Sequence, residues 1–121
     1  MNNGIASFRD LNVYQKAYAI SINIHKHSKS FPKDEQYGIT NQLRRASRSI
    51  CANIAEGFAK QRTSKAEFKR FLMIAVGSAS EVLVWIDYCR DFEFIDERTH
   101  EIWKAEYEAI SKMLNAFHSK V

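Results

Sequence analysis

The stretch from Phe71 to Ile86, FLMIAVGSASEVLVWI, decides the fold of this chain. Its apolar residues recur at helical spacing, which predicts a helix with a buried core stripe. That stripe comprises Phe68, Phe71, Leu72, Ala75, Ala79, Val82, Leu83, Ile86 and Cys89, while Met73, Ile74, Val84, Trp85 and Tyr88 fall on the other side. A helix that is apolar all round must be covered all round. Because three other helices of a short chain would cover only part of it, we expect a second copy to cover the rest.

The composition is that of an ordinary soluble protein with one domain. Of the 121 residues, 45% are hydrophobic and 26% are charged, and one proline and four glycines favour long helices. The N-terminal segment lacks the basic start and apolar run of a signal peptide. Residues 71–86 are fewer than the roughly 20 that a bilayer requires and include Glu81. We expect a cytoplasmic protein with no membrane partner, in which Cys51 and Cys89 are reduced, buried small hydrophobes.

Charge is divided unevenly along the chain. Residues 1–70 hold 13 Lys/Arg against 5 Asp/Glu, which gives +8. Residues 71–121 hold 5 against 9, which gives −4 and leaves the net charge of +4. This asymmetry indicates either an anionic partner for the basic part or pairing between unlike parts of two subunits.

Breaks in the apolar pattern predict four helices within a single domain, over residues 10–27, 35–60, 64–92 and 97–118. Pro32 ends the first helix because it lacks an N–H and restrains the preceding residue, and Asp34 is the expected N-cap of the second. Ser64 and Glu67 form a capping box for the third helix, and Asp96 caps the fourth. The fourth has the cleanest apolar face, formed by Ile102, Trp103, Ile110, Met113, Leu114 and Phe117. Short connections make sequential helices antiparallel neighbours, so we expect an all-α, up-down-up-down four-helix bundle.

The most specific pattern lies between Gln42 and Gly57, QLRRASRSICANIAEG. A polar column follows its core stripe, and its small residues are poor helix formers that suit the close approach of another backbone. Glu81 lies alone among apolar residues, and we expect Arg45 or Arg48 to pair with it, within or between subunits, because an unpaired buried charge is costly. The predicted subunit interface comprises Arg45, Ser49, Asn53, Glu56, Gly57, Ile74, Ser78, Glu81, Trp85 and Tyr88. A solvated helix face is the alternative interpretation of the polar column.

Basic residues surround the expected turn between the second and third helices. The predicted nucleic-acid ligands are Arg44, Arg48, Lys60, Arg62, Lys65, Lys69 and Arg70. Only Glu67 opposes them around the turn, and the N-terminus of the third helix adds amides that suit phosphate. We expect RNA or DNA binding through the backbone, strongly salt-dependent and without stacking, since no aromatic residues are interleaved. A solvated charged face is the alternative.

Catalytic and metal-binding patterns are not expected. Glu97 and His100 have the spacing of a di-iron ligand pair, but such a site needs a second pair and two further carboxylates, and the chain has no second Glu-x-x-His. His25 and His27 point to different faces of their helix. The sequence also lacks a glycine-rich phosphate loop and a nucleophile elbow. We therefore expect no enzymatic activity, metal, cofactor or small-molecule substrate.

Two motifs resemble the signature of the 23S rRNA intervening-sequence protein family, which comprises small bacterial four-helix bundle proteins. They are Arg45-Ala46-Ser47-Arg48-Ser49-Ile50 with Asn53-Ile54-Ala55-Glu56-Gly57-Phe58, and Phe68-x-x-Phe71-Leu72-x-x-Ala75-x-Gly77-Ser78-x-x-Glu81. The resemblance implies a closed bundle, a homopentameric ring and no established enzymatic activity. Some genes of this type lie within inserts of the large ribosomal RNA gene, and related retroelement accessory proteins form basic pentamers that engage nucleic acid.

Two functions therefore stay open. The first is a non-catalytic nucleic-acid-binding or accessory protein, for which the resemblance favours RNA. The second is a protein–protein scaffold whose basic part meets an acidic partner or the acidic part of another copy. Salt-dependent RNA binding by the purified protein would favour the first.

Overall fold

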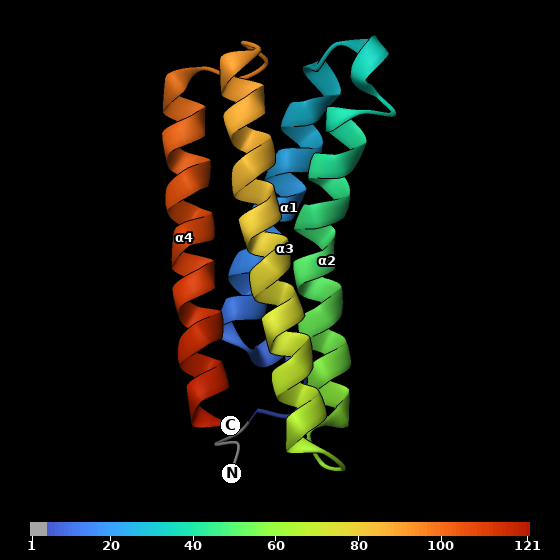
Figure 1. Cartoon of the computed structure of the whole chain (residues 1–121), viewed down its shortest axis with the longest axis vertical. Coiled ribbons are helices and arrows are strands. Elements are labelled where there is room, and N and C mark those ends of the chain that lie inside the picture. The colour runs from blue at the N-terminus through green and yellow to red at the C-terminus, as the bar shows by residue number, and fades with distance from the viewer. Residues whose placement is uncertain (1–4) are drawn as a thin grey trace.

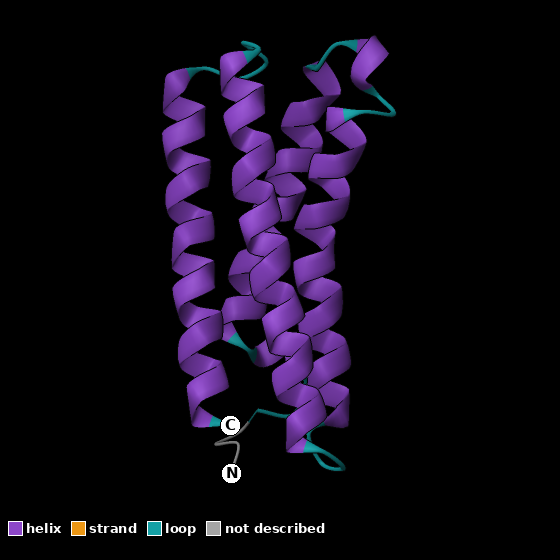
Figure 2. Ribbon diagram, in the orientation of Figure 1, coloured by secondary structure: helices purple, strands orange, loops and turns teal. Residues whose placement is uncertain are grey.

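The computed structural model describes residues 5–121, which form four α-helices and no strand. The helices are α1 (Asn12–His27), α2 (Ile39–Lys60), α3 (Lys65–Asp91) and α4 (Glu97–Lys120), with three short 3-10 helices at Phe8–Asp10, Ser28–Ser30 and Lys33–Glu35. Figure 1 shows the four helices side by side along the long axis, with consecutive helices joined at alternating ends. Figure 2 shows the loops that connect the four helices at those ends. All four helices contribute to one hydrophobic core, so the predicted all-helical class is confirmed.

Local capping sets the starts of α3 and α4, as predicted. Ser64 Oγ accepts a hydrogen bond from the amide of Glu67 at 3.1 Å, and Asp96 Oδ1 accepts one from the amide of Thr99 at 2.8 Å. The second half of the predicted capping box is not formed, because the Glu67 carboxylate accepts from Arg70 instead. Apart from the start of α2, the helix ends lie within two residues of the predicted bounds.

The predicted start of α2 is wrong by four residues. Residues 33–35 form a 3-10 turn, and α2 begins at Ile39 with Gly38 as its N-cap. Asp34 therefore does not cap α2. Glu35 takes that role from within the turn, since its Oε1 accepts a hydrogen bond of 3.3 Å from the amide of Ile39. A Cβ on Gly38 would lie 2.7 Å from the same Oε1, so glycine leaves room for this capping contact.

Polar side chains also join α1 to α4. The buried Trp103 of α4 donates from Nε1 to Oδ1 of Asn23 on α1 at 3.0 Å, and Lys16 of α1 pairs with Glu106 of α4 at 3.1 Å. The predicted core stripes of α2 and α3 are buried for the most part. Ile102 is an error in the predicted face of α4, because its side chain is 50% exposed.

Gly57 sets the close approach of α2 and α3. A Cβ at this position would lie 2.8 Å from Cβ of Phe71 and 3.1 Å from Cδ1 of Phe68. A real Cβ would therefore overlap side chains of α3. The prediction that a small residue here admits another backbone is correct, but the backbone belongs to the same chain, and Gly57 is buried inside the protomer rather than exposed to a second subunit.

Replacing Gly57 with alanine will destabilise the protein. The added methyl group overpacks the α2–α3 contact, at a cost of about 1–3 kcal/mol, which outweighs a gain in helix propensity of up to about 1 kcal/mol. Urea unfolding followed by circular dichroism, at a protein concentration low enough to leave the chain monomeric, measures the change. Gly77→Ala is the matched control, because no atom lies within 4 Å of a Cβ added there. Equal stability of the two variants would contradict this packing argument.

Candidate subunit and nucleic-acid interfaces

One face of α3 is left uncovered by the rest of the described chain. Met73, Ile74, Val84 and Tyr88 are exposed there, beside the half-buried Trp85. Gly77 lies in the middle of these residues with open space around it. A mid-helix glycine reduces helix stability by about 1 kcal/mol relative to alanine, and packing within the protomer does not explain its use. The predicted excess of apolar surface on this helix is confirmed.

Beside this face, polar residues join α2 to α3. The hydroxyls of Ser49 and Ser78 lie 2.9 Å apart, and Asn53 Nδ2 donates to the carbonyl and the Oγ of Ser49 at 2.8 and 3.0 Å. All three residues are half-buried. Three of the predicted interface residues thus form one hydrogen-bonded cluster on the seam between the two helices.

The predicted ion pair of Glu81 is not formed within the protomer. Glu81 is exposed, and its Oε2 accepts from Nε1 of Trp85 at 3.1 Å. Arg45 donates to a neighbouring glutamine at 3.3 Å, and Arg48 donates to the backbone carbonyl one turn earlier at 3.2 Å. Because solvent reaches Glu81 in the single chain, no intrachain partner is required. Glu56, also predicted at the interface, is exposed on α2.

The predicted nucleic-acid ligands do not form one patch. Arg44 and Arg48 lie in the first half of α2, whereas the other five surround the α2–α3 turn. From Arg44 to Lys60 the helix rises by about 24 Å, at 1.5 Å per residue. Figure 1 places the α1–α2 and α2–α3 connections at opposite ends of the molecule. The prediction that the two arginines extend the turn cluster is therefore wrong.

We call the remaining cluster the basic turn, formed by Lys60, Arg62, Lys65 and Lys69. Arg62 and Lys65 are exposed, and none of the four forms an ion pair with a carboxylate in residues 5–121. Arg70 differs, because it donates two hydrogen bonds of 3.1 Å to Glu67 and its guanidinium lies 4.6 Å from the centre of the Phe71 ring. Those hydrogen bonds hold the pKa of Glu67 below its ordinary value. Arg70 is a paired residue and is less available to a ligand.

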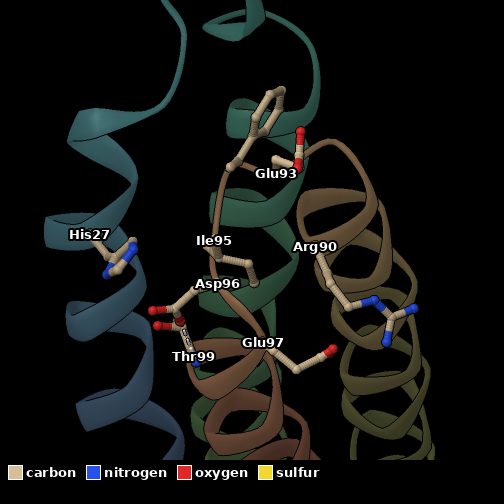
Figure 3. Close-up of a pocket in the computed structure, with 8 residues that line it drawn as sticks. His27, Arg90, Glu93, Ile95, Asp96, Glu97 and Thr99 are labelled. Atoms are coloured by element: carbon tan, nitrogen blue, oxygen red, sulfur yellow. Dashed lines mark hydrogen bonds between the residues drawn. The ribbon is translucent and has the colours of Figure 1, made fainter.

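A pocket opens at the turn between α3 and α4. Its lining residues are His27, Arg90, Glu93, Phe94, Ile95, Asp96, Glu97 and Thr99. Figure 3 shows Asp96 directed toward His27 and Glu97 directed toward Arg90. The backbone amide of Thr99 lowers the pKa of Asp96 by donating to its carboxylate, which caps α4. The lining therefore mixes both signs of charge and lacks the concentration of one sign that a charged ligand needs.

His100 is buried where α4 meets α3. The residue is only 1% exposed, and its Nε2 lies 2.8 Å from Oδ1 of Asp87 on α3. Its Nδ1 has no hydrogen-bond partner and lies 3.8 Å from Oε1 of Glu101. Donor atoms of Glu97, His100 and Glu101 lie within 4.8 Å of one another. All three come from one helix, whereas a di-iron site draws carboxylates from facing helices.

α3 is long and apolar enough, by length and composition, to cross a membrane. The sequence argument that residues 71–86 are too short therefore does not hold for the 27-residue helix. Of the 18 most apolar consecutive residues of this helix, 33% are buried inside the protein. The absence of a membrane partner stays a prediction.

Both cysteines lie in the core. Burial raises the pKa of Cys51 to about 11 and that of Cys89 to about 12. Because the thiolate is the reactive species, neither residue has the chemistry of a nucleophile at neutral pH. Burial also raises the pKa of Tyr107 far above its ordinary value.

The native thiols will resist modification. At pH 8 the rise of the Cys51 pKa from 9.0 to about 11 lowers its thiolate fraction about 100-fold, so Ellman's reagent should react fast only after unfolding in urea. The same shift makes stability fall as pH rises above 9 toward 11 and 12, because the unfolded chain releases these protons first. Rapid labelling of the folded protein at pH 8 would contradict this prediction.

The chain resembles known proteins in both sequence and fold. The family model described as 23S rRNA-intervening sequence protein matches residues 9–116. A crystal structure described as a protein with unknown function from the S23 ribosomal protein family of Bacteroides thetaiotaomicron matches with a TM-score of 0.78 at 25% identity, covering 88% of this chain and 95% of the other. No curated protein matches the chain. Because the family model spans nearly all of the four-helix fold, the resemblance carried by the α2 and α3 motifs is confirmed, and the chain belongs to the 23S rRNA-intervening sequence protein family.

Proposed function

We propose that the chain is a non-catalytic, self-assembling protein that binds nucleic acid through the basic turn. The observation that carries this proposal is the set of four cations around one short connection, with no carboxylate of the described chain paired to them. Lys and Arg that lack a protein partner are suited to neutralise phosphates, and repetition in an oligomer would multiply the contacts. The family description names an intervening sequence of 23S rRNA, which makes RNA the favoured ligand.

The geometry of the basic turn favours binding to the backbone of a nucleic acid. The turn ends at Ser64, so the first amides of α3 lie among the cations and add partial positive charge. The Phe71 ring beside the turn is buried, lies under Lys60 and Arg70, and offers no free face for a base. Electrostatic contacts without stacking give low sequence preference and strong salt dependence.

Two exposed apolar surfaces of unlike charge support the proposed self-assembly. One is the uncovered face of α3, which carries Glu81. The other lies on α1, where Tyr18 and Ile22 are exposed. Positive charge lies beside the second surface, since Arg44 first, and then Lys29 and Arg48, lower the pKa of His25, three residues beyond Ile22 on the same helix. Two complementary surfaces on different sides of a protomer make a head-to-tail contact, which closes into a ring when the rotation allows it.

We therefore extend the proposal to an antiparallel four-helix bundle assembled as a homo-oligomeric ring, with five subunits by family resemblance. In this arrangement Glu81 of one protomer faces the Arg48 side of the next. The contact buries apolar residues that a monomer leaves in water, which is the dominant favourable term in protein association.

Neutralising the basic turn should weaken RNA binding. The triple variant Lys60→Gln, Arg62→Gln, Lys65→Gln loses phosphate contacts, so the slope of log K against log salt should fall by roughly 2 units per protomer engaged. Fluorescence anisotropy with a mixed-sequence single-stranded RNA, titrated at about 50 to 200 mM salt, measures this change. The triple variant Lys104→Gln, Lys112→Gln, Lys120→Gln removes three exposed charges from α4 and is the control. Equal losses of RNA affinity in the two triple variants would show that the net charge of the protein, and not the basic turn, controls binding.

A charge placed on the uncovered face of α3 should dissociate the oligomer. Val84→Glu and Ile102→Glu form a matched pair, because both side chains are 50% exposed and both lie on helices. Only the first lies in the proposed subunit contact, where burying an unpaired carboxylate is costly. Sedimentation velocity should show smaller particles for Val84→Glu and the parental size for Ile102→Glu. A parent protein that sediments as a 14.0 kDa monomer would overturn the assembly proposal.

A protein–protein scaffold is the second candidate function, and the uncovered face of α3 also favours it. In that case a different protein would cover Met73, Val84 and Tyr88. A monomeric chain without RNA affinity at low salt, which recovers a partner only when Val84 is intact, would support the scaffold. Flotation of the protein with lipid vesicles would instead identify a membrane as the occupant of this face.

A further inference from the structure

A second basic surface lies at the opposite end of the molecule from the basic turn. A pocket opens there, between the end of α1 and the start of α2. Its polar lining comprises Ser28, Lys29, Lys33, Gln36, Thr40 and Arg44. Phe31, which is buried, and Pro32 form the apolar wall. Of these residues only Arg44 was predicted from the sequence to bind an anion.

Arg44 is held in a fixed position by the chain that precedes it. Its Nε donates to Oγ of Ser28 at 2.8 Å, and its Nη2 donates to the carbonyl of His25 at 3.2 Å. Ser28 is itself buried and donates to the same carbonyl at 3.1 Å. These bonds use two of the five N–H groups that an arginine carries. The guanidinium is therefore positioned before any ligand arrives, with donors remaining for it.

Thr40 provides an independent sign that a polar ligand belongs in this pocket. The residue is 5% exposed and lies in the first turn of α2. Its Oγ1 has no hydrogen-bond partner. A buried hydroxyl without a partner is unfavourable, whereas a ligand oxygen at the pocket would accept its hydrogen bond.

The charges around the pocket are predominantly positive. Lys29 and Lys33 are exposed and form no ion pair within the described part of the chain. The nearest acidic residues in sequence are Asp34 and Glu35, and neither lines the pocket. Glu35 is engaged with the first amide of α2. The lowered pKa of His25, caused first by Arg44, reports the same positive field.

We propose that this pocket binds a phosphate group. A fixed guanidinium, a buried hydroxyl and two free ammonium groups supply several donors and three positive charges, which match the oxygens and the charge of a phosphate. A carboxylate would use fewer of these donors. The phosphate belongs either to a nucleic-acid backbone or to a free phosphate compound. The site does not depend on the basic turn, so a failure of the proposed function would not contradict it.

Isothermal titration with inorganic phosphate, in a phosphate-free buffer of low ionic strength, tests the site. The parent protein should bind phosphate saturably, and Thr40→Val and Lys33→Gln should each weaken binding about tenfold. Because the Thr40 hydroxyl is unpartnered, Thr40→Val should also leave the free protein at least as stable as the parent in urea. Thr63→Val, at an exposed turn threonine, is the matched control, and the triple variant of the basic turn should keep its affinity for phosphate.

Measuring RNA binding by the same variants distinguishes the two possible sources of the phosphate. If the natural ligand is a nucleic-acid backbone, Lys33→Gln will weaken RNA binding as well as phosphate binding. If the ligand is a free phosphate compound, RNA affinity will be unchanged while phosphate affinity falls. Absence of saturable phosphate binding by the parent would overturn the proposal, and so would affinities of Thr40→Val and Lys33→Gln that both equal the affinity of the parent.

Discussion

The rest of the structure depends on the close approach of α2 and α3 at Gly57. Without a Cβ at this position, Phe68 and Phe71 pack directly against the α2 backbone. The two helices are then near enough for the Ser49 and Ser78 hydroxyls to meet at 2.9 Å, about two turns further along. Because the helices are so close at their joined end, a short polar turn connects them and gathers its cations in one place. The apolar packing thus positions both the seam beside the α3 face and the basic turn.

The two sides of α3 lie in different environments. Its buried stripe, from Phe68 to Cys89, completes the core with α1, α2 and α4. Its opposite side has Met73, Val84 and Tyr88 in water. A soluble helix that only closes a core normally carries polar residues there. Basic residues outnumber acidic ones on α1 and α2, whereas the part of α3 from Phe71 to Asp91 carries three carboxylates and one arginine. The exposed apolar surfaces of α1 and α3 are therefore complementary in charge as well as in hydrophobicity.

Features governed by neighbours in sequence could be predicted, and features governed by distant residues could not. Helix periodicity and the caps at Ser64 and Asp96 are local, and the structure reproduces them. The start of α2 was misplaced because Glu35 caps it from inside a 3-10 turn, an arrangement that the preference for Asp34 does not reveal. The sequence places Arg44 with the cations of the α2–α3 turn, and its true position could not be predicted because its partners lie 16 and 19 residues earlier, across the α1–α2 connection. The orphan hydroxyl of Thr40 has no sequence signal at all, since it depends on what surrounds the first turn of α2.

The separation of the two basic surfaces limits how a nucleic acid would contact both. About 24 Å of α2 lies between Arg44 and Lys60, which corresponds to roughly seven base pairs of duplex at 3.4 Å per pair. Between the two surfaces α2 carries Arg45 and Arg48 against a single carboxylate, Glu56, so the favourable path follows α2 past Arg48. That path is also flanked by the two surfaces assigned to subunit contacts. Assembly would therefore narrow or close it, and the basic turn and the phosphate pocket would then contact separate phosphates at opposite ends of each protomer.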